Sequence, residues 1–486
     1  MPSNPTTKSQ VQAYRFMLRR MESALVRKDA VMLHEPMRHH LRASAVGLIL
    51  GVLGLAAFFV VGMFKPSSRA EVGDIVMING QTSVFVVAEG PGEERRLVPM
   101  TNLTSARLLV AALRPGADGP PEIKPVEESA LADLVPVPRT GLIDVPSYLP
   151  DQKNLVGGEW SVCDTADVRE DLPNAESRPE LSTTVIGGVP RPGQPLGEDQ
   201  ALLVEDPTNR THYLVWHGRR GQVNLNDNAV KLVYELNGIV PRKVSAGLLN
   251  AIPEGASLNP PDIPGIGDPV TFSQLSGVLV GEVARLEQAG QESFFLVRQQ
   301  GLEQVSPVVA NLMSIHSLRD IRDVTPAGVR DVPQVNTDDF DDFPVQAPKV
   351  RTTAETRIAC LVWQGVDKDP VITFSTDETQ LLGEGNRPVP VPGAVRGKQA
   401  DHVFLERGKA ALVRGVVEGQ NPDTGRIWLV IDQQLYGVPD IDTARALGLG
   451  DTTTPAPDSV LRLLRSGPNL DPQEALALYD ANQPGR

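Results

Sequence analysis

One stretch of this 486-residue sequence comes close to a phosphate-binding loop. Such a loop reads Gly-x4-Gly-Lys-Ser/Thr between a strand and a helix, and its hydroxyl group holds magnesium. The residues from Gly393 to Gln399 read Gly-Ala-Val-Arg-Gly-Lys-Gln, so the two glycines are one residue too close and Gln399 replaces the hydroxyl. We therefore expect no ATP hydrolysis at this loop, and no cofactor.

Residues of the types that can bind metals or act in catalysis do not occur at the spacing of any known site either. His34, His39 and His40 lack a metal-binding spacing such as His-x3-His. The aspartates within 338–342 lack the Gly and distal Glu of a calcium loop, which favours a solvated acidic connector. The chain has no Gly-x-Ser-x-Gly elbow. The sequence thus predicts no catalytic residues and no metal site, and it gives little support to an enzyme.

An apolar run from Ser44 to Phe64 dominates the chain and contains no charged residue. As a helix rising about 1.5 Å per residue, it spans about 30 Å, the thickness of a bilayer's hydrocarbon core. A buried core helix of this length would carry a polar stripe. A signal peptide would end in small residues, whereas Lys65 and Pro66 follow this run. The run therefore predicts a transmembrane helix at 44–64.

The charge on the two sides of this run predicts its orientation. Residues 1–42 hold eight Lys or Arg and three acidic residues, a net charge of +5, whereas the whole chain carries −14. Arg38 and Arg42 are the basic residues that flank the membrane. Because basic flanks stay in the cytoplasm, we expect a single-pass protein of the plasma membrane with its N-terminus inside and its acidic bulk outside. An acidic outer region also argues against binding to nucleic acid.

Residues 1–43 are predicted to form a cytoplasmic amphipathic arm. Thr7 and Gln10 have the spacing of a capping box, and Pro36 is expected to break the helix before the span. Apolar residues recur at helical spacing on one face, at Val11, Tyr14, Leu18, Met21 and Leu25. Two interpretations stay open: the helix lies on anionic lipid headgroups, or this face binds partner subunits beneath the membrane.

The outer region contains both cysteines of the chain, Cys163 and Cys360. An oxidising compartment permits them to pair, and we predict that they do. Closing a loop of about 200 residues would stabilise the fold by roughly 5 kcal/mol as an upper figure. The alternative is two separate buried thiols.

An internal repeat organises the same region. Four segments each show an apolar strand, a turn, a second short strand and a small helix, which is typical of small α+β modules. The apolar strands are Val84–Val87, His212–Trp216, Ser293–Val297 and Arg426–Val430. Asn102, Asn228 and Asp442 occupy the expected N-cap positions of three helices. The irregular spacing excludes a solenoid of fixed period.

The repeats form two pairs along the chain, and the segment inside each pair carries one cysteine. These segments are Trp160–Thr165 and Ile358–Trp363. If the two inserts meet, Cys163 meets Cys360 in a composite central domain. We expect repeat modules at 70–120, 196–258, 270–325 and 401–450, the two parts of the central domain at 121–195 and 326–400, and a C-terminal tail at 451–486.

Several motifs together resemble the EccB family, a single-pass membrane component of type VII (ESX) secretion systems of mycobacteria and their relatives. The resemblance runs from end to end in the same order. It is carried by Gln10–Arg20, Glu35–Arg38, Asn102–Leu108, Cys163–Thr165, Tyr436–Pro439 and Thr443–Gly448. Some members of the family are called ATPases, although no Walker motif is present here.

The resemblance implies a single-pass membrane protein whose α+β periplasmic region has four small repeat modules around a central β-rich, disulfide-linked core domain. It implies an arm bound to the EccC-type motor ATPase and to EccD, with EccE and the mycosin protease in the same system. It also implies a periplasmic dimer within a hexameric assembly.

The leading hypothesis is therefore a structural core subunit that anchors and assembles the secretion machinery. A second hypothesis makes the outer modules a device that binds peptidoglycan and fixes the complex to the cell wall, and a third makes the protein an ATPase. The sequence does not tell which ESX system or which substrates are involved.

Overall fold

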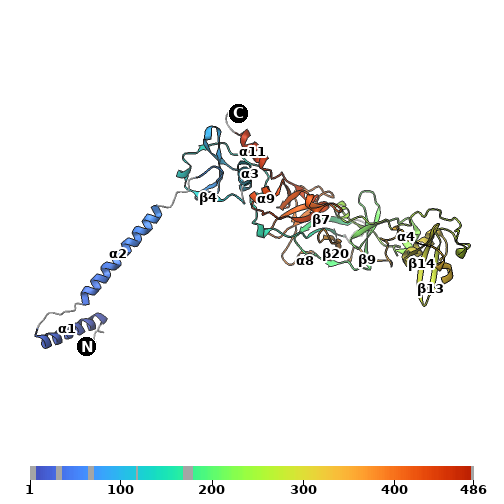
Figure 1. Ribbon diagram of the computed structural model, residues 1–486, viewed down its shortest axis with the longest axis horizontal. Coiled ribbons are helices and arrows are strands. Elements are labelled where there is room, and N and C mark those ends of the chain that lie inside the picture. The colour runs from blue at the N-terminus through green and yellow to red at the C-terminus, as the bar shows by residue number, and fades with distance from the viewer. Residues whose placement is uncertain (1–6, 29–35, 64–69, 117–118, 168–178, 483–486) are drawn as a thin grey trace. The chain divides into compact units, whose positions relative to one another are not determined.

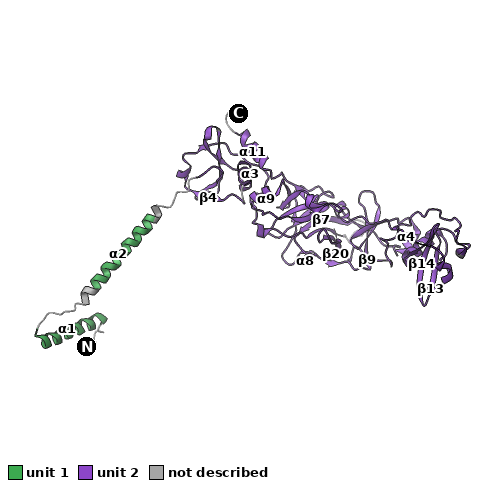
Figure 2. Ribbon diagram, viewed as in Figure 1, with its two compact units in different colours: residues 1–69 green, residues 70–486 purple. Residues whose placement is uncertain are grey.

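The computed structural model describes residues 7–28, 36–63, 70–116, 119–167 and 179–482. The chain divides into two compact units, residues 1–69 and residues 70–486 (Figure 2). Each unit is described by itself. His34, one of the three histidines considered above, lies outside the described residues.

The first unit consists of two helices, α1 (Lys8–Arg27) and α2 (Pro36–Met63). At the start of α1, the backbone N–H of Thr7 donates to the side-chain oxygen of Gln10 at 2.9 Å, as a capping box requires. Pro36 was expected to break a helix, but it begins α2, where a missing N–H costs no helical hydrogen bond. The helix therefore starts eight residues before the predicted span.

The second unit contains four sheets with one repeated topology and a fifth, larger sheet (Figure 1). In each repeat, three antiparallel strands follow one another along the chain and a helix comes next. A fourth strand then pairs parallel to the first, and in modules 1, 3 and 4 a fifth pairs parallel to the third. We call these repeats modules 1 to 4 and the larger sheet the central sheet.

Modules 1 and 2 are the first two repeats along the chain. Module 1 consists of β1 (Ile75–Ile78), β2 (Val84–Glu89), β3 (Arg95–Pro99), α3 (Leu103–Leu113), β4 (Ile123–Val126) and β5 (Val135–Pro136). Module 2 consists of β9 (Gln200–Glu205), β10 (His212–Trp216), β11 (Arg219–Val223), α4 (Asn228–Val233), β12 (Arg242–Lys243) and α5 (Ala246–Ala251). In module 2 a single parallel bridge between Arg220 and Glu254 stands in place of the fifth strand, and β18 (Lys349–Val350) adds to β9.

Modules 3 and 4 repeat the full five-strand order. Module 3 consists of β13 (Val283–Gln288), β14 (Gln291–Arg298), β15 (Gly301–Val305), α6 (Pro307–Ser317), β16 (Arg322–Asp323), α7 (Pro326–Arg330) and β17 (Gln334–Val335). Module 4 consists of β23 (Ala411–Val416), β24 (Ile427–Ile431), β25 (Gln434–Val438), α9 (Ile441–Ala446), β26 (Thr454–Pro457), α10 (Asp458–Leu461) and β27 (Arg465–Ser466). The terminal helix α11 (Pro472–Ala481) follows.

The central sheet takes strands from two distant parts of the chain. Its order is β21-β22-β7-β6-β19-β20-β8. The strands are β6 (Trp160–Asp167), β7 (Glu180–Gly187), β8 (Gln194–Pro195), β19 (Ile358–Trp363), β20 (Val371–Ser375), β21 (Val389–Pro390) and β22 (His402–Phe404), with helix α8 (Glu378–Leu382) after β20. The composite domain expected from the two cysteine segments is therefore one continuous sheet.

Modules 1 and 3 each have a small apolar core of their own, and all four modules also bury apolar surface in cores that they share. Modules 1 and 4 share a core in which Leu109 lies with Leu429, and α11 packs on α3 within it. Modules 2 and 3 share another core, in which Val230 lies with Leu312. A further core joins the central sheet to modules 2 and 4. The first and last modules along the chain therefore pack together, and so do the second and third.

The predicted fold class is confirmed, with differences in detail. The N-cap of α3 is Asn102 as expected, with its side chain 2.7 Å from the N–H of Ser105. The other two cap predictions were wrong: Asp227 and Asp440 cap α4 and α9. Several strands of the modules also lie outside the expected module ranges: β4, β5, β17 and β18 fall in the ranges assigned to the central domain, and β26 and β27 fall in the assigned tail.

Candidate functional site

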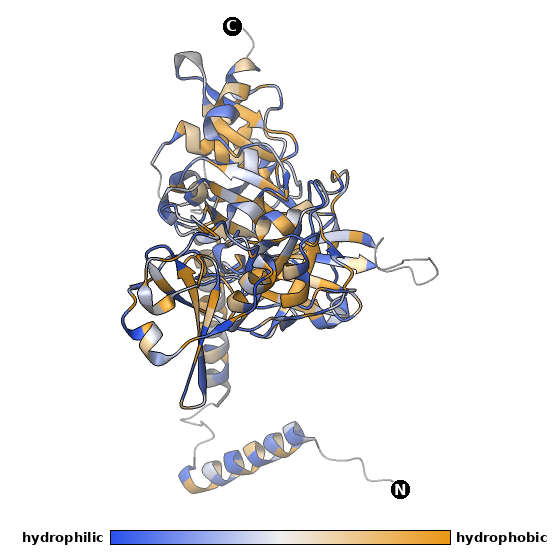
Figure 3. Ribbon diagram, turned by 90° about the vertical axis from the view of Figure 1, so that its right-hand side faces the viewer, coloured by the Kyte–Doolittle hydropathy of each residue, from blue (hydrophilic) through white to orange (hydrophobic). Residues whose placement is uncertain are grey.

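The arm helix α1 carries the apolar face that the sequence predicts. Its five residues are exposed in this chain, with exposed fractions of 39% for Val11, 58% for Tyr14, 45% for Leu18, 53% for Met21 and 82% for Leu25. Figure 3 shows hydrophilic and hydrophobic residues on the same helix. No residue of α1 is buried. The structure therefore places these side chains on one helix with nothing from the described chain covering them.

Within the described residues, α2 contains one stretch long and apolar enough to cross a membrane, His40–Val60. These 21 residues begin four positions before the predicted start at Ser44, and none of the stretch is buried. Arg42 is exposed, and Arg38 lies in the first turn of α2. His40 is exposed too, at the start of the stretch. Phe64, the predicted last residue of the span, lies outside the described residues.

The two cysteines form a disulfide at the middle of the central sheet. Cys163 of β6 and Cys360 of β19 are directly opposite each other on paired antiparallel strands, with their Cα atoms 4.0 Å apart. Both are 1% exposed, and Leu381 and Leu382 of α8 cover them in one apolar cluster. The bond therefore joins two halves of the sheet that lie 197 residues apart in sequence.

Asp164, the residue after Cys163, has a fully buried carboxylate that accepts several hydrogen bonds. Ser245 donates its backbone N–H at 2.6 Å and its hydroxyl at 2.8 Å, and the hydroxyl of Thr183 donates at 2.9 Å. Ser245 is the N-cap of α5, so Asp164 holds module 2 against the central sheet. Burial raises the pKa of Asp164, and the hydrogen bonds and the charge of Arg242 oppose that rise.

Arg242 extends this network to a third segment. It donates to the backbone oxygens of Asp164 and Arg357, at 3.0 Å each, and to that of Thr356. Burial lowers its pKa to about 10. This cluster was not predicted from the sequence. The triplet Cys163–Thr165 drew attention to this strand. However, a single aspartate forms no sequence pattern that would predict its burial or its partners.

The loop tested as a phosphate site lies at the edge of the central sheet. Gly393–Gln399 forms turns between β21 and β22, so a strand rather than a helix follows it. A phosphate-binding loop relies on the N-terminus of the helix that follows, and this loop leads to none. Lys398 is exposed and lines a cleft described below.

The four aspartates at 338–342 are all exposed, as expected of a solvated connector, but the stretch also makes specific contacts with two modules. Asp339 pairs with Arg298 at 2.7 Å, and Asp342 accepts the backbone N–H of Ala256 at 3.1 Å. Phe343 is buried in the core shared by modules 2 and 3. The stretch is thus a surface connector that Phe340 and Phe343 attach to the core shared by modules 2 and 3. Among the described residues, no group of three or more His, Cys, Asp or Glu side chains is placed to hold a metal ion.

A family model described as "Type VII secretion system ESX-1, transport TM domain B", that of EccB, matches residues 3–484. The chain belongs to the EccB family. Among its relatives, "ESX-3 secretion system ATPase EccB3" of Mycobacterium tuberculosis H37Rv is 30% identical, over 98% of this chain and 90% of the relative. "ESX-1 secretion system ATPase EccB1" of the same strain is 27% identical, over 98% and 95%. The names of these relatives call them ATPases.

Solved structures agree with this assignment to the EccB family. A chain from an intact ESX-5 inner membrane complex matches with a TM-score of 0.68 and 26% identity, over 98% of this chain and 96% of that one. A chain from an EccB3 dimer of the ESX-3 core complex matches with a TM-score of 0.68 and 25% identity, over 83% and 99%. The resemblance seen in the sequence is confirmed over the whole chain.

The double variant Cys163→Ser/Cys360→Ser removes the bond between the two halves of the central sheet. We expect the free energy of unfolding to fall by about 2–5 kcal/mol, because the unfolded chain regains the freedom of a long loop. Urea unfolding of the oxidised protein and the variant measures this difference. A non-reducing peptide mass map that finds two free thiols in the wild-type protein would contradict the assignment.

Asp164→Ala leaves the buried donors of Ser245 and Thr183 without an acceptor and leaves Arg242 without a nearby carboxylate. We expect a loss of about 3–5 kcal/mol in unfolding free energy. The matched control is Asp167→Ala on the same strand, since Asp167 is about half exposed and pairs with Arg357 at the surface. The control should lose about 1 kcal/mol or less. Equal losses in the two variants would show that burial of Asp164 carries no special role.

Proposed function

We propose that this protein is a structural core subunit of a type VII secretion membrane complex. The observation that supports this most is the end-to-end match to an EccB-family chain within an intact ESX-5 inner membrane complex. In this proposal α2 anchors the chain, α1 contacts neighbouring subunits, and the second unit assembles outside the membrane. Each of these roles depends on position and contact rather than on a catalytic group.

The orientation follows from charge. Residues 1–42 carry a net +5, and Arg42 is exposed beside the span. Because basic flanks remain in the cytoplasm, α1 lies in the cytoplasm and the second unit lies in the periplasm. A chain of a periplasmic assembly from the ESX-5 inner membrane complex covers 87% of this chain, which supports this placement of the second unit.

Two observations support the choice of partners: the exposed apolar face of α1, and membership of the EccB family. Five exposed apolar side chains on one helix are a suitable surface for an apolar groove of another subunit. In this system the candidates are the EccC-type ATPase, EccD, EccE and the mycosin protease. The relative solved as an EccB3 dimer supports self-association of the second unit in this chain as well.

Two other roles receive less support. We do not propose ATP hydrolysis, because the loop around Lys398 leads into a strand rather than a helix. Binding to peptidoglycan stays a prediction from the sequence. Sedimentation of the purified protein with cell-wall sacculi tests it, since a pure scaffold should remain in the supernatant.

Leu18→Glu together with Met21→Glu places two charges in the apolar face of α1. If that face binds EccC and EccD, burial of the charges costs several kcal/mol, and recovery of both partners with the extracted complex should fall more than about tenfold. Quantitative mass spectrometry of the detergent-extracted complex measures this. Deleting residues 1–42 should have at least the same effect.

The control is Ser23→Glu, which adds one charge of the same sign on the opposite side of α1 and should leave partner recovery unchanged. Unchanged recovery in the double variant would contradict the partner-binding role of α1. If that variant instead loses affinity for anionic vesicles, the helix binds lipid headgroups and the alternative interpretation holds.

A further inference from the structure

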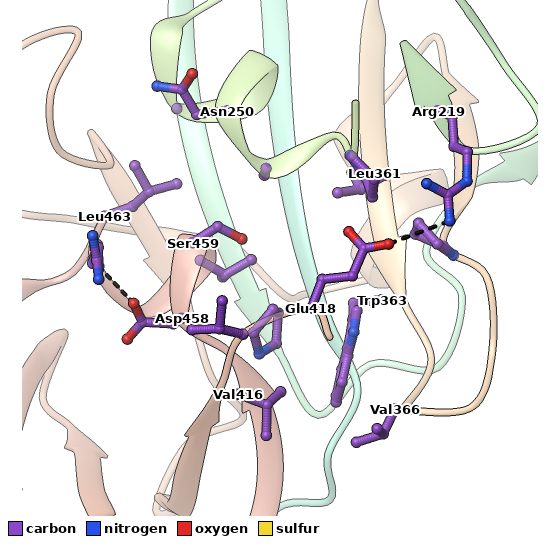
Figure 4. A pocket seen from close by; sticks show the side chains of 18 of the residues that line it. Arg219, Asn250, Leu361, Trp363, Val366, Val416, Glu418, Asp458, Ser459 and Leu463 are labelled. Carbon is purple, nitrogen blue, oxygen red and sulfur yellow. Dashed lines mark hydrogen bonds and ion pairs between the residues drawn. The ribbon is translucent and has the colours of Figure 1, made fainter. Parts of the chain in front are cut away.

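Arg219 of β11 lines two hollows in the second unit. The larger is a cleft of about 960 Å³ where module 2, the central sheet and module 4 meet (Figure 4). The side chains that line this cleft carry four positive and four negative charges, so it selects no ligand by charge. The smaller hollow is a pocket of about 140 Å³ between module 2 and the acidic connector at 338–343, and we call it the small pocket.

Module 2 supplies one wall and the floor of the small pocket. Trp216, at the end of β10, is directly opposite Arg219 across a two-residue turn at 217–218, in which both residues have positive φ. Residues 255–258 run beside β11, to which two of their N–H groups donate at 2.9 Å each. Gly221 permits this approach, because a Cβ there would lie 2.7 Å from a side-chain carbon of that segment. The tight hairpin and the adjacent segment therefore fix the position of the indole.

Two carboxylates form the opposite wall. Asp341 and Asp342 lie between Phe340 and Phe343, whose rings meet edge to face at 5.3 Å and pack on the core shared by modules 2 and 3. One oxygen of Asp342 accepts the backbone N–H of Ala256 at 3.1 Å. Among the described residues, none donates to its other oxygen or to the carboxylate of Asp341. The pocket thus holds carboxylate oxygens that are fixed in place and still able to accept.

The charges of the small pocket favour a cation. Its walls contain two carboxylates and one guanidinium, that of Arg219, which leaves a net charge of −1 with His217 neutral. That guanidinium already pairs with Glu418 at 3.3 Å and with Asp369 at 3.8 Å on the side of the cleft (Figure 4). The indole of Trp216 adds to the preference, since tryptophan is the aromatic side chain that attracts cations most strongly.

Size and ligand number decide which cation fits. The pocket is smaller than the about 300–1,000 Å³ that sites for whole small molecules occupy. Calcium takes six to eight oxygen ligands, and two carboxylates supply too few of them. The end of a single basic side chain meets both limits. An ammonium group has three donors and no acceptor, which matches a wall of free carboxylate oxygens.

We propose that the small pocket binds the ammonium group of a lysine side chain of a partner protein. The ammonium lies against the indole of Trp216 and donates to the free oxygens of Asp341 and Asp342. A neutral side chain would cover these carboxylates without pairing them, which costs free energy. This contact belongs to the second unit and does not rest on the role proposed for α1.

The test uses the full chain in nanodiscs of zwitterionic lipid, with capped lysine (N-acetyl-lysine N-methylamide) as the probe. Saturation-transfer difference NMR should show a saturable signal on the methylene groups next to the ammonium, with empty nanodiscs as the blank. Capped Nε-acetyl-lysine, which has the same stem and no charge, should bind about fivefold more weakly or less, and added salt should weaken binding of the lysine.

Asp341→Asn/Asp342→Asn should weaken binding of capped lysine by about fivefold. Both side chains are exposed, and an amide oxygen at position 342 still accepts the N–H of Ala256, so the fold is kept. The matched control is Glu287→Gln/Glu292→Gln, which removes two exposed carboxylates from the β13–β14 hairpin and should leave binding unchanged. Trp216→Leu should also weaken binding, and if that variant fails to fold, the aspartate variant still decides.

The proposal is overturned if capped lysine gives no saturable signal, if the acetylated probe binds equally well, or if the aspartate variant binds lysine normally. An equal loss in the hairpin control would show that only the overall charge attracts the probe. Displacement of the lysine by equimolar calcium would assign the pocket to a metal ion. Loss of self-association in the aspartate variant would assign it to contacts between copies of this chain. Each of these results contradicts the proposal.

Discussion

The antiparallel pairing of β6 with β19 is the contact on which the second unit depends. The two strands come from segments almost 200 residues apart, and everything between them, including modules 2 and 3, forms one closed loop. Closing so long a loop costs conformational entropy. The contacts that offset this cost are concentrated where β6 pairs with β19. There Cys163 bonds to Cys360, and Asp164 binds Ser245 and Thr183 inside the apolar core.

The modules do not stand alone, because part of the apolar surface of each is buried only by another module or by the central sheet. Modules 1 and 3 bury one apolar cluster internally, but a small sheet with one or two helices still leaves apolar surface that a neighbour must cover. Each module therefore shares a core with another: module 1 with module 4, and module 2 with module 3. The C-terminal helix α11 completes the first of these cores, so both ends of the unit lie in the same pair of modules.

The parts that could be predicted from the sequence are those with a strong local signal. The middle strand of each module, such as β10 or β24, lies at the centre of its sheet and contains a run of apolar residues, so the sequence predicts it. Strands of two residues, such as β12, carry no periodicity and were missed. Caps were misplaced by one or two residues where polar residues are adjacent, as at Asp227 and Asn228. Asp164 escaped notice because its role comes from residues distant in sequence.

The function follows from where each unit lies relative to the membrane, and cysteine labelling tests this most directly. Gln291→Cys in the β13–β14 hairpin and Ser9→Cys in α1 both place a thiol at an exposed position, while the two native cysteines are bonded to each other and buried. With a membrane-impermeant maleimide on intact spheroplasts, Gln291→Cys should react and Ser9→Cys should react only after lysis. Labelling of Ser9→Cys from outside, with Gln291→Cys protected until lysis, would contradict the proposed orientation and the assembly role built on it.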